Sequence, residues 1–208
     1  MLVTDYQYFG NICFIELLYK EKQVCFDSHA PFTKMSFKNK MVILSAQGPL
    51  ALTIPIVGGR DQKTTIQDIR IAYDAPWQAQ HFKAIKTCYK RAPYFEYYEA
   101  DLEKLYTTKT EFLVDFLEAC HAFIQKAIKG KWELKAFKDR LEKIKEEEIT
   151  AKEMHPWQPN NYAQFPIQHK YQQVFTSPSG FIQNLSILDM LFCVGGKEIS
   201  KQLSEKLN

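Results

Sequence analysis

The period of the hydrophobic pattern changes near residue 73, and this change constrains the fold more than any other feature. Before it, apolar residues come in short runs bounded by turn-forming residues, which is typical of strands. After it, apolar residues recur every three or four positions over longer stretches, which is typical of amphipathic helices. The pattern predicts an α/β (or α+β) fold, with 1–73 mainly strands plus one helix and 74–208 mainly helical. We expect a single domain with a mixed sheet.

The expected elements follow from these runs and their turn signals. The predicted strands are Met1–Thr4, Gln23–Asp27, a hairpin of Met41–Ala46 with Leu50–Val57, and Ile66–Tyr73. The predicted helices are Phe9–Tyr19, Trp77–Arg91 opened by Asp74 to Pro76, Glu99–Tyr106, Thr110–Lys129 ended by Gly130, and Trp132–Glu148. His155–Pro166 is predicted to be a long ordered loop.

Composition excludes several classes of protein. The net charge of +3 is small and the basic residues are scattered, which argues against a nucleic-acid partner. No apolar run approaches the roughly 20 residues that span a bilayer, and the N-terminus does not resemble a secretory signal. The five cysteines are odd in number and widely spaced, which indicates thiols in a reducing compartment. We therefore expect a cytoplasmic protein.

Familiar catalytic motifs are missing from the sequence. There is no G-x-S-x-G, H-E-x-x-H or paired-cysteine motif, and the five histidines lack metal-ligand spacing. Gly58–Thr64 resembles a phosphate loop, but Gln62 replaces the second required glycine, so a surface turn is the better interpretation. The sequence therefore predicts no metal site and no evident cofactor.

The loop from Asp27 to Lys40 is the first candidate site. It follows a predicted strand and contains His29, Lys34 and Asn39. Open α/β sheets bind their ligands at such strand ends. Composition alone also fits an ordinary polar connecting loop.

The helix Trp77–Arg91 is the second candidate. His81 lies one turn after Trp77 and shares its apolar face. His81 could be a general base in a pocket or a hydrogen-bonded core residue, and the core role is the commoner one.

The third candidate is the helix start at Ser186. Ser186 and Asp189 have the spacing of a capping box, with Leu185 and Met190 placed as a hydrophobic staple. We expect the Ser186 hydroxyl to accept from the Asp189 N–H, with Asp or Asn tolerated in its place. The same N–H groups would suit an anionic ligand, so the two uses compete.

Taken together, these segments resemble the WbqC-like family of bacterial proteins. The blocks that carry the resemblance are Asp27 with His29, Lys34–Lys40, Leu52–Ile56, Trp77, His81, Tyr89, Ala92–Tyr98, Tyr171–Phe175, Gly180–Phe181 and Asn184–Asp189. They cover most of the chain. The sequence departs from the family at Lys40, where Arg is usual, and at Cys193–Gly196, which replaces an Asn-x-Gly-Pro pattern.

The resemblance implies a protein of surface-polysaccharide or O-antigen biosynthesis that transfers an aminoacyl or similar small group to a sugar or sugar nucleotide. We expect one pocket where the loop 27–40, the helix 77–91 and the segment 171–189 converge. His81 or His29 would act as general base with Asp27 beside it. The expected substrate-binding residues are Lys34, Asn39, Lys40, Trp77, Tyr171, Gln172, Asn184 and Asp189. Two alternatives remain open: a non-catalytic module that binds a glycan precursor or carrier protein, and a scaffold.

Overall fold

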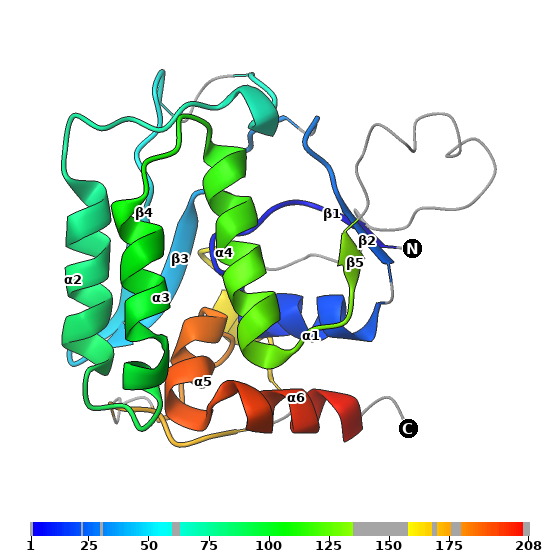
Figure 1. Cartoon of the computed structure of the whole chain (residues 1–208), viewed down its shortest axis with the longest axis vertical. Coiled ribbons are helices and arrows are strands. Elements are labelled where there is room, and N and C mark those ends of the chain that lie inside the picture. The colour runs from blue at the N-terminus through cyan, green and yellow to red at the C-terminus, as the bar shows by residue number, and fades with distance from the viewer. Residues whose placement is uncertain are drawn as a thin grey trace.

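The computed structural model describes residues 2–21, 23–29, 31–59, 63–134, 158–167, 170–175 and 180–205. These residues form a mixed α/β fold with small sheets in the N-terminal part and mostly helices after them (Figure 1). The strands are β1 (Leu2–Thr4), β2 (Gln23–Phe26), β3 (Lys40–Ser45), β4 (Gly48–Thr53) and β5 (Glu133–Leu134). The helices are α1 (Ile12–Lys20), α2 (Trp77–Tyr89), α3 (Phe95–Thr107), α4 (Leu113–Ile128), α5 (Ile187–Val194) and α6 (Gly196–Glu205). The predicted fold class is confirmed.

The described strands form two small sheets in place of the single mixed sheet that we expected. One is parallel, in the order β1-β2-β5, with Leu2 opposite Val24 and Thr4 opposite Phe26. The other is the β3–β4 hairpin, in which Lys40 pairs with Thr53. Helix α1 connects β1 to β2, as a parallel pair requires. The carboxyl ends of β1 and β2 therefore lie side by side.

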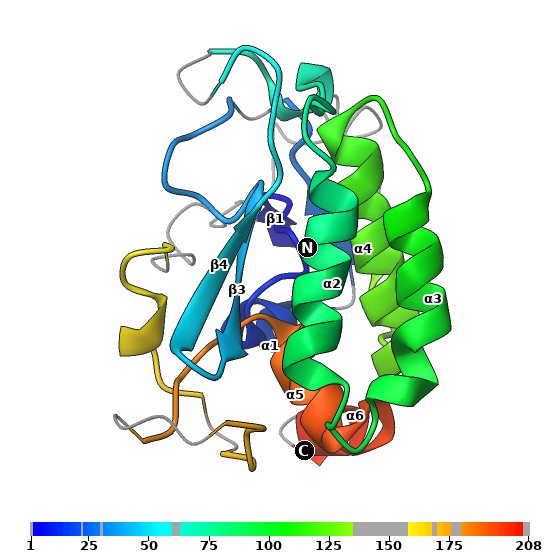
Figure 2. The same ribbon diagram turned by 90° about the vertical axis from the view of Figure 1, so that its left-hand side faces the viewer.

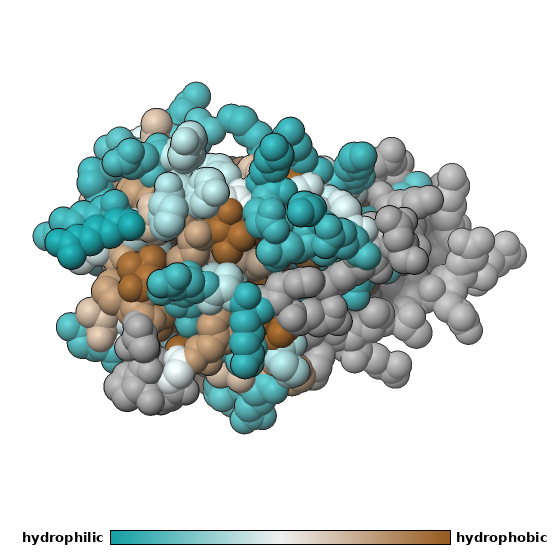
Figure 3. Space-filling view, turned by 90° about the horizontal axis from the view of Figure 1, so that it is seen from below, coloured by the Kyte–Doolittle hydropathy of each residue, from teal (hydrophilic) through white to brown (hydrophobic). Residues whose placement is uncertain are grey.

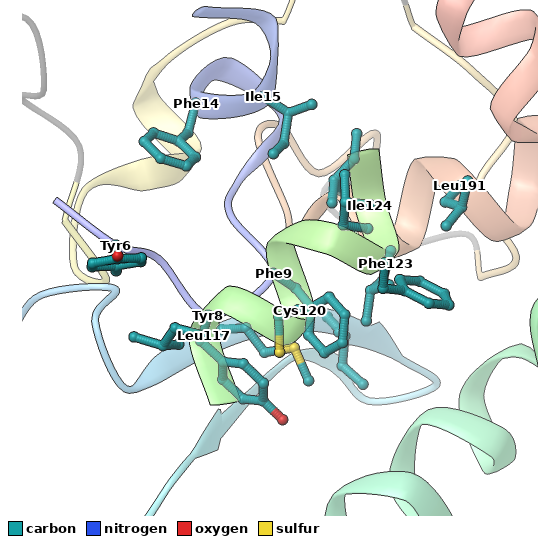
Figure 4. Packing of buried hydrophobic residues seen from close by; sticks show 14 of the residues in the cluster. Tyr6, Tyr8, Phe9, Phe14, Ile15, Leu117, Cys120, Phe123, Ile124 and Leu191 are labelled. Carbon is teal, nitrogen blue, oxygen red and sulfur yellow. The ribbon is translucent and has the colours of Figure 1, made fainter. Parts of the chain in front are cut away.

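Helices α2, α3 and α4 form a layer that faces the β3–β4 hairpin (Figure 2). Helices α5 and α6 lie at one end of this layer (Figure 1). One hydrophobic cluster contains residues from both ends of the described chain, from Leu2 to Leu203. Figure 4 shows part of it, in which α4 contributes Leu117, Cys120, Phe123 and Ile124. Helix α4 buries an apolar face in this core, and its apolar periodicity is typical of such a helix.

The expected strand Ile66–Tyr73 is the clearest error. The segment opens with a 3-10 turn at Ile66–Asp68, and Arg70 and Ile71 make only isolated bridges to Phe112 and Ile56. Its alternating pattern is real, because Ile69 and Ile71 are buried while Arg70 is exposed. Alternation reports which side chains face the core, but a strand also needs a neighbour along its whole length.

Several helix ends also differ from expectation. Helix α3 begins at Phe95 instead of Glu99, and α4 begins at Leu113 instead of Thr110. The left-handed residue after α4 is Lys129, with φ of 52°, and Gly130 follows it. Gly130 is required for a different reason, because a Cβ there would lie 2.1 Å from the Trp132 indole.

Two other expectations concern helix starts. Asp74 does not cap α2, whose N-cap position is Pro76 and has no side-chain cap bond. The expected helix Trp132–Glu148 is wrong at its start, since Glu133–Leu134 is β5, and its remainder lies outside the described residues. The expected loop His155–Pro166 is described only from residue 158, where it contains a 3-10 turn at Tyr162–Gln164.

Ser186 is the N-cap of α5, as predicted, but its partners differ. Its hydroxyl accepts from the Leu188 N–H at 3.4 Å and donates to the Phe9 carbonyl at 3.3 Å. The backbone N–H of Ser186 donates to Val42, so Asp189 does not complete a capping box. The staple is also absent from the described core, because Leu185 and Met190 belong to different hydrophobic clusters.

Ser186→Ala should lower the free energy of unfolding by about 1 kcal/mol, because one cap bond and the bond to Phe9 are lost. Ser186→Asp should cost more than Ala, which revises the tolerance expected from sequence. The reason is that Asp would place a negative charge against the Phe9 carbonyl oxygen at a site that is only 3% exposed, whereas Ala places no charge there. Urea unfolding of both variants measures their free energies of unfolding. A Ser186→Asp variant as stable as the wild type would contradict this prediction.

Candidate functional site

A small polar cavity lies where the parallel strands β1 and β2 end. The Asp27 N–H donates to the Thr4 carbonyl at 2.9 Å, which joins the two strand ends. We call this space, of about 220 Å³, the strand-end cavity. Its lining residues are Thr4, Asp5, Tyr6, Gln7, Thr33, Lys34, Met35, Ser36, Phe37, Lys38 and Gln158.

A buried lysine builds one wall of the strand-end cavity. The Lys38 side chain is 3% exposed, and its Nζ lies 2.9 Å from Asp5 Oδ2. It also donates to the Pro31 carbonyl at 3.2 Å and to Thr33 Oγ1 at 3.4 Å. A buried ammonium is stable only with such compensation, so Lys38 fixes the loop 31–38 over the strand end. The Asp5 side chain stays 48% exposed, which leaves its carboxylate accessible from the cavity.

Three of the residues predicted from sequence lie around this end of the sheet. Asp27 directly follows β2, and its Oδ1 accepts from the His29 backbone N–H at 3.0 Å. His29 is exposed, with its Nδ1 3.3 Å from Ser28 Oγ, and Lys34 lines the cavity. Sequence reasoning found this loop, but it missed Asp5 and Lys38, whose pairing spans two segments.

Beneath the cavity, α4 supports the residues that follow β1. Tyr6 donates from its hydroxyl to Glu118 Oε1 at 2.9 Å, and the Gln7 N–H donates to His121 Nε2 at 3.4 Å. Burial lowers the pKa of His121 to about 4, and Phe26 packs on its ring at 4.5 Å. His121 is therefore a neutral acceptor that positions Gln7. Its place on the apolar face of α4 was the only sequence signal for it.

His81, the first candidate base, lies in the core. Its Nδ1 is 3.0 Å from the Tyr8 hydroxyl, which also bonds to the Tyr106 hydroxyl. A further bond joins the ring to the backbone of Thr53, and burial lowers the pKa of His81 to about 4. Both sides of the imidazole are thus occupied by the protein, which favours a structural role for this residue.

Asp189 forms a second buried polar centre. Its carboxylate is fully buried and accepts from the Tyr89 hydroxyl at 2.6 Å, the Tyr171 hydroxyl at 2.5 Å and Gln173 Nε2 at 3.1 Å. Burial raises the pKa of this carboxyl group, and the three donors oppose that rise. Asp189 therefore ties α2, the segment 171–173 and α5 together.

A cavity of about 540 Å³ adjoins this centre, and we call it the α2–α5 cavity. Its lining residues are Thr87, Cys88, Lys90, Arg91, Ala92, Pro93, Gln172, Gln173, Val174, Phe175 and Cys193. Burial raises the pKa of Cys193 to about 12 and that of Cys88 as well, so both thiols stay neutral. The end of the molecule that carries α5 and α6 mixes hydrophobic and hydrophilic surface (Figure 3).

The remaining predicted residues are spread over the fold. Asn184 is fully buried, and its Oδ1 accepts from the Cys13 N–H in the first turn of α1. The Asn39 amide donates to the Ile54 carbonyl at 2.9 Å, and Lys40 begins β3. Trp77 lines a third cavity, between α2 and α3. Two of the three predicted segments do meet at the α2–α5 cavity, but none of the three cavities described here is lined by all three.

The chain was compared with known proteins. A family model described as the WbqC-like protein family matches residues 7–155. The chain belongs to this family. No curated protein and no solved structure gives a match. The match ends before Tyr171, so the C-terminal blocks of this WbqC-like chain rest on the sequence resemblance alone.

Two further features bear on the class of protein. No helix in the described part of the chain is both long enough and apolar enough to cross a membrane. No disulfide joins the five cysteines, all of which lie among the described residues.

The two buried histidines should make the fold acid-sensitive. Each has a folded-state pKa of about 4, below the ordinary 6.5, so the unfolded chain binds protons more readily. The contribution of each neutral histidine to the free energy of unfolding is therefore complete above pH 6.5. It is lost as the pH falls toward 4, and it amounts to roughly 3 kcal/mol per histidine. His121→Gln, which keeps an acceptor for Gln7, should reduce this slope in urea unfolding between pH 7.5 and 4.5. Equal slopes in the wild type and in His121→Gln would contradict the assignment.

Proposed function

We propose that this WbqC-like protein binds a sugar or sugar nucleotide at the strand-end cavity and transfers an aminoacyl or similar small group to it. This would be a step in surface-polysaccharide or O-antigen biosynthesis. The observation that supports the site most is the ion pair between buried Lys38 and half-exposed Asp5, beside the carboxyl ends of two parallel strands. Open α/β sheets bind ligands at this edge.

The size of the cavity limits what it can hold. Ligand pockets usually measure about 300 to 1,000 Å³. The strand-end cavity, at about 220 Å³, therefore suits one polar part of a larger molecule, such as a sugar ring or a phosphate. The Asp5 carboxylate can accept from sugar hydroxyls, and Lys34 can donate to a phosphate. Lys40, at the start of β3 nearby in sequence, is a second proposed anion contact.

Acyl transfer to a sugar needs one base near the acceptor. A bond forms between the acyl carbon and a sugar oxygen or nitrogen, the bond to the leaving group breaks, and the proton of the acceptor passes through the base to the leaving group. The donor would be an activated acyl compound, such as an ester or thioester. We assign the base to His29, which is exposed beside the strand end, with Asp27 fixing its backbone. His81 is left out because its ring is buried in the core, where it bonds to Tyr8 and Thr53.

A non-catalytic module that binds a glycan precursor or carrier protein is the second candidate. An exposed aromatic pair favours it: Tyr97 is 80% exposed, and its ring centroid lies 6.1 Å from that of Tyr94. Exposed aromatic side chains commonly mark surfaces that bind partners. Turnover distinguishes the two candidates, since a module binds without converting its ligand.

Lys34→Ala should weaken binding of a sugar nucleotide about tenfold or more, because a charge-assisted hydrogen bond contributes about 1.5 to 3 kcal/mol. A thermal-shift screen of sugar nucleotides would find the compound, and calorimetric titration would measure its affinity. Lys90→Ala, which removes a lysine of the α2–α5 cavity, is the matched control and should bind normally. Loss of binding in Lys90→Ala but not in Lys34→Ala would move the site to the α2–α5 cavity.

His29→Asn should leave binding intact and lower turnover by a factor of about 10² to 10⁴, as expected for a lost general base. Unchanged turnover in this variant would reject His29 as the base. Binding that depends on Lys34 without any turnover in the wild type would support the binding module.

A further inference from the structure

A third cavity, of about 550 Å³, lies between the start of α2 and the end of α3. We call it the aromatic cavity. Four aromatic residues line it: Tyr73, Trp77, Phe82 and Tyr106. The other lining residues are Asp74, Ala75, Pro76, Gln78, Ala79, Glu103, Thr107 and Lys109. Its volume falls within the ordinary range for small-molecule sites.

The four rings form a connected wall that is held in place. Ring centroids are 6.2 Å apart for Tyr73 and Trp77, 6.4 Å for Trp77 and Tyr106, and 6.2 Å for Phe82 and Tyr106. The Tyr73 hydroxyl donates to the Thr110 carbonyl at 2.8 Å and accepts from the Thr110 N–H at 3.2 Å. Because these contacts already hold the four rings in place, ligand binding would cost little free energy for ordering their side chains.

One ammonium already lies against this wall. Lys109 Nζ is 5.2 Å from the centroid of the Tyr73 ring, within the range of a cation–π contact. Lys109 comes from the short connection between α3 and α4 and is exposed, so its side chain can leave the ring at little cost. One face of the Tyr73 ring therefore already contacts an ammonium group, that of Lys109.

The charges around the cavity also favour a cation. Asp74 and Glu103 contribute two carboxylates, and Lys109 contributes one ammonium. The N-terminus of α2 adds a partial positive charge of roughly one half. The negative charge of the two carboxylates exceeds these positive charges. The excess grows once the Lys109 side chain has moved away from the cavity.

We propose that the aromatic cavity is a second ligand site, which takes a small organic ammonium compound with an apolar body. Its ammonium group replaces that of Lys109 on the Tyr73 ring, near Asp74 and Glu103. Its apolar body lies against Phe82 and the accessible edges of Trp77 and Tyr106, which are 2% and 3% exposed. This site is separate from the strand-end cavity and does not depend on the proposed transfer reaction.

Titration with 2-phenylethylammonium chloride, followed by the indole N–H resonance of Trp77 in NMR spectra, tests the site. The neutral isostere 2-phenylethanol is the matched probe, because it keeps the apolar body and lacks the charge. We expect saturable shifts with the amine and at least tenfold weaker binding of the alcohol. No saturable shift with the amine would overturn the proposal, and equal affinities would show a merely apolar pocket and also overturn it.

Three variants test the role of the charges. Lys109→Ala removes the internal competitor and should strengthen amine binding severalfold, whereas Asp74→Asn and Glu103→Gln should each weaken it. Lys83→Ala, on an exposed position of α2 outside the cavity lining, should leave the affinity unchanged. An affinity that Lys109→Ala does not change would show that the ammonium does not bind on Tyr73, which contradicts the proposal.

Discussion

The N-termini of α1 and α5 cap each other, and the rest of the structure depends on this contact. The Ile12 N–H donates to the Leu185 carbonyl at 3.0 Å, and the Ile187 N–H donates to the Gly10 carbonyl at 2.9 Å. The first N–H groups of a helix lack partners within the helix, and burying them unpaired is costly. Each helix solves this problem with residues from the far end of the chain, so neither start can be buried here without the other.

This arrangement requires strained backbone on both sides. Phe9 and Asn184 are left-handed, with φ of 50° and 51°, and Gly10 has φ of 39°. A left-handed residue other than glycine costs of order 1 kcal/mol or more, and it persists only where its surroundings fix it. Asn184 is fixed through its amide, which accepts from Cys13 at 2.9 Å. Both helix N-termini are thus occupied by the protein, so the cap excludes the competing use of the α5 N–H groups as an anion site. In our proposal, anion binding therefore depends on side chains such as Lys34.

The sequence predicts those parts of the fold whose signals are local. Ser186 at the start of α5 and the apolar period of α4 each depend on a few neighbouring residues, and both were found. The prediction of a strand at Ile66–Tyr73 was wrong because the alternation can be read from the local sequence, whereas pairing with a neighbouring strand depends on residues far away in the chain. Lys38 was overlooked for the same reason, since a lysine is normally exposed and only its distant partner Asp5 explains its burial.

Buried polarity alone is a poor guide to the site. Asp189, His81 and His121 are all buried with shifted pKa values, which often marks functional groups. Yet the Asp189 carboxylate already accepts three hydrogen bonds, and both buried histidines accept or share bonds with neighbouring residues. Such groups stabilise the fold and have little capacity left for a ligand. Asp5 differs, because one side of its carboxylate holds Lys38 while about half of the side chain remains accessible. A polar group that is fixed but not saturated is the stronger indication of a site, and this argument favours the strand-end cavity.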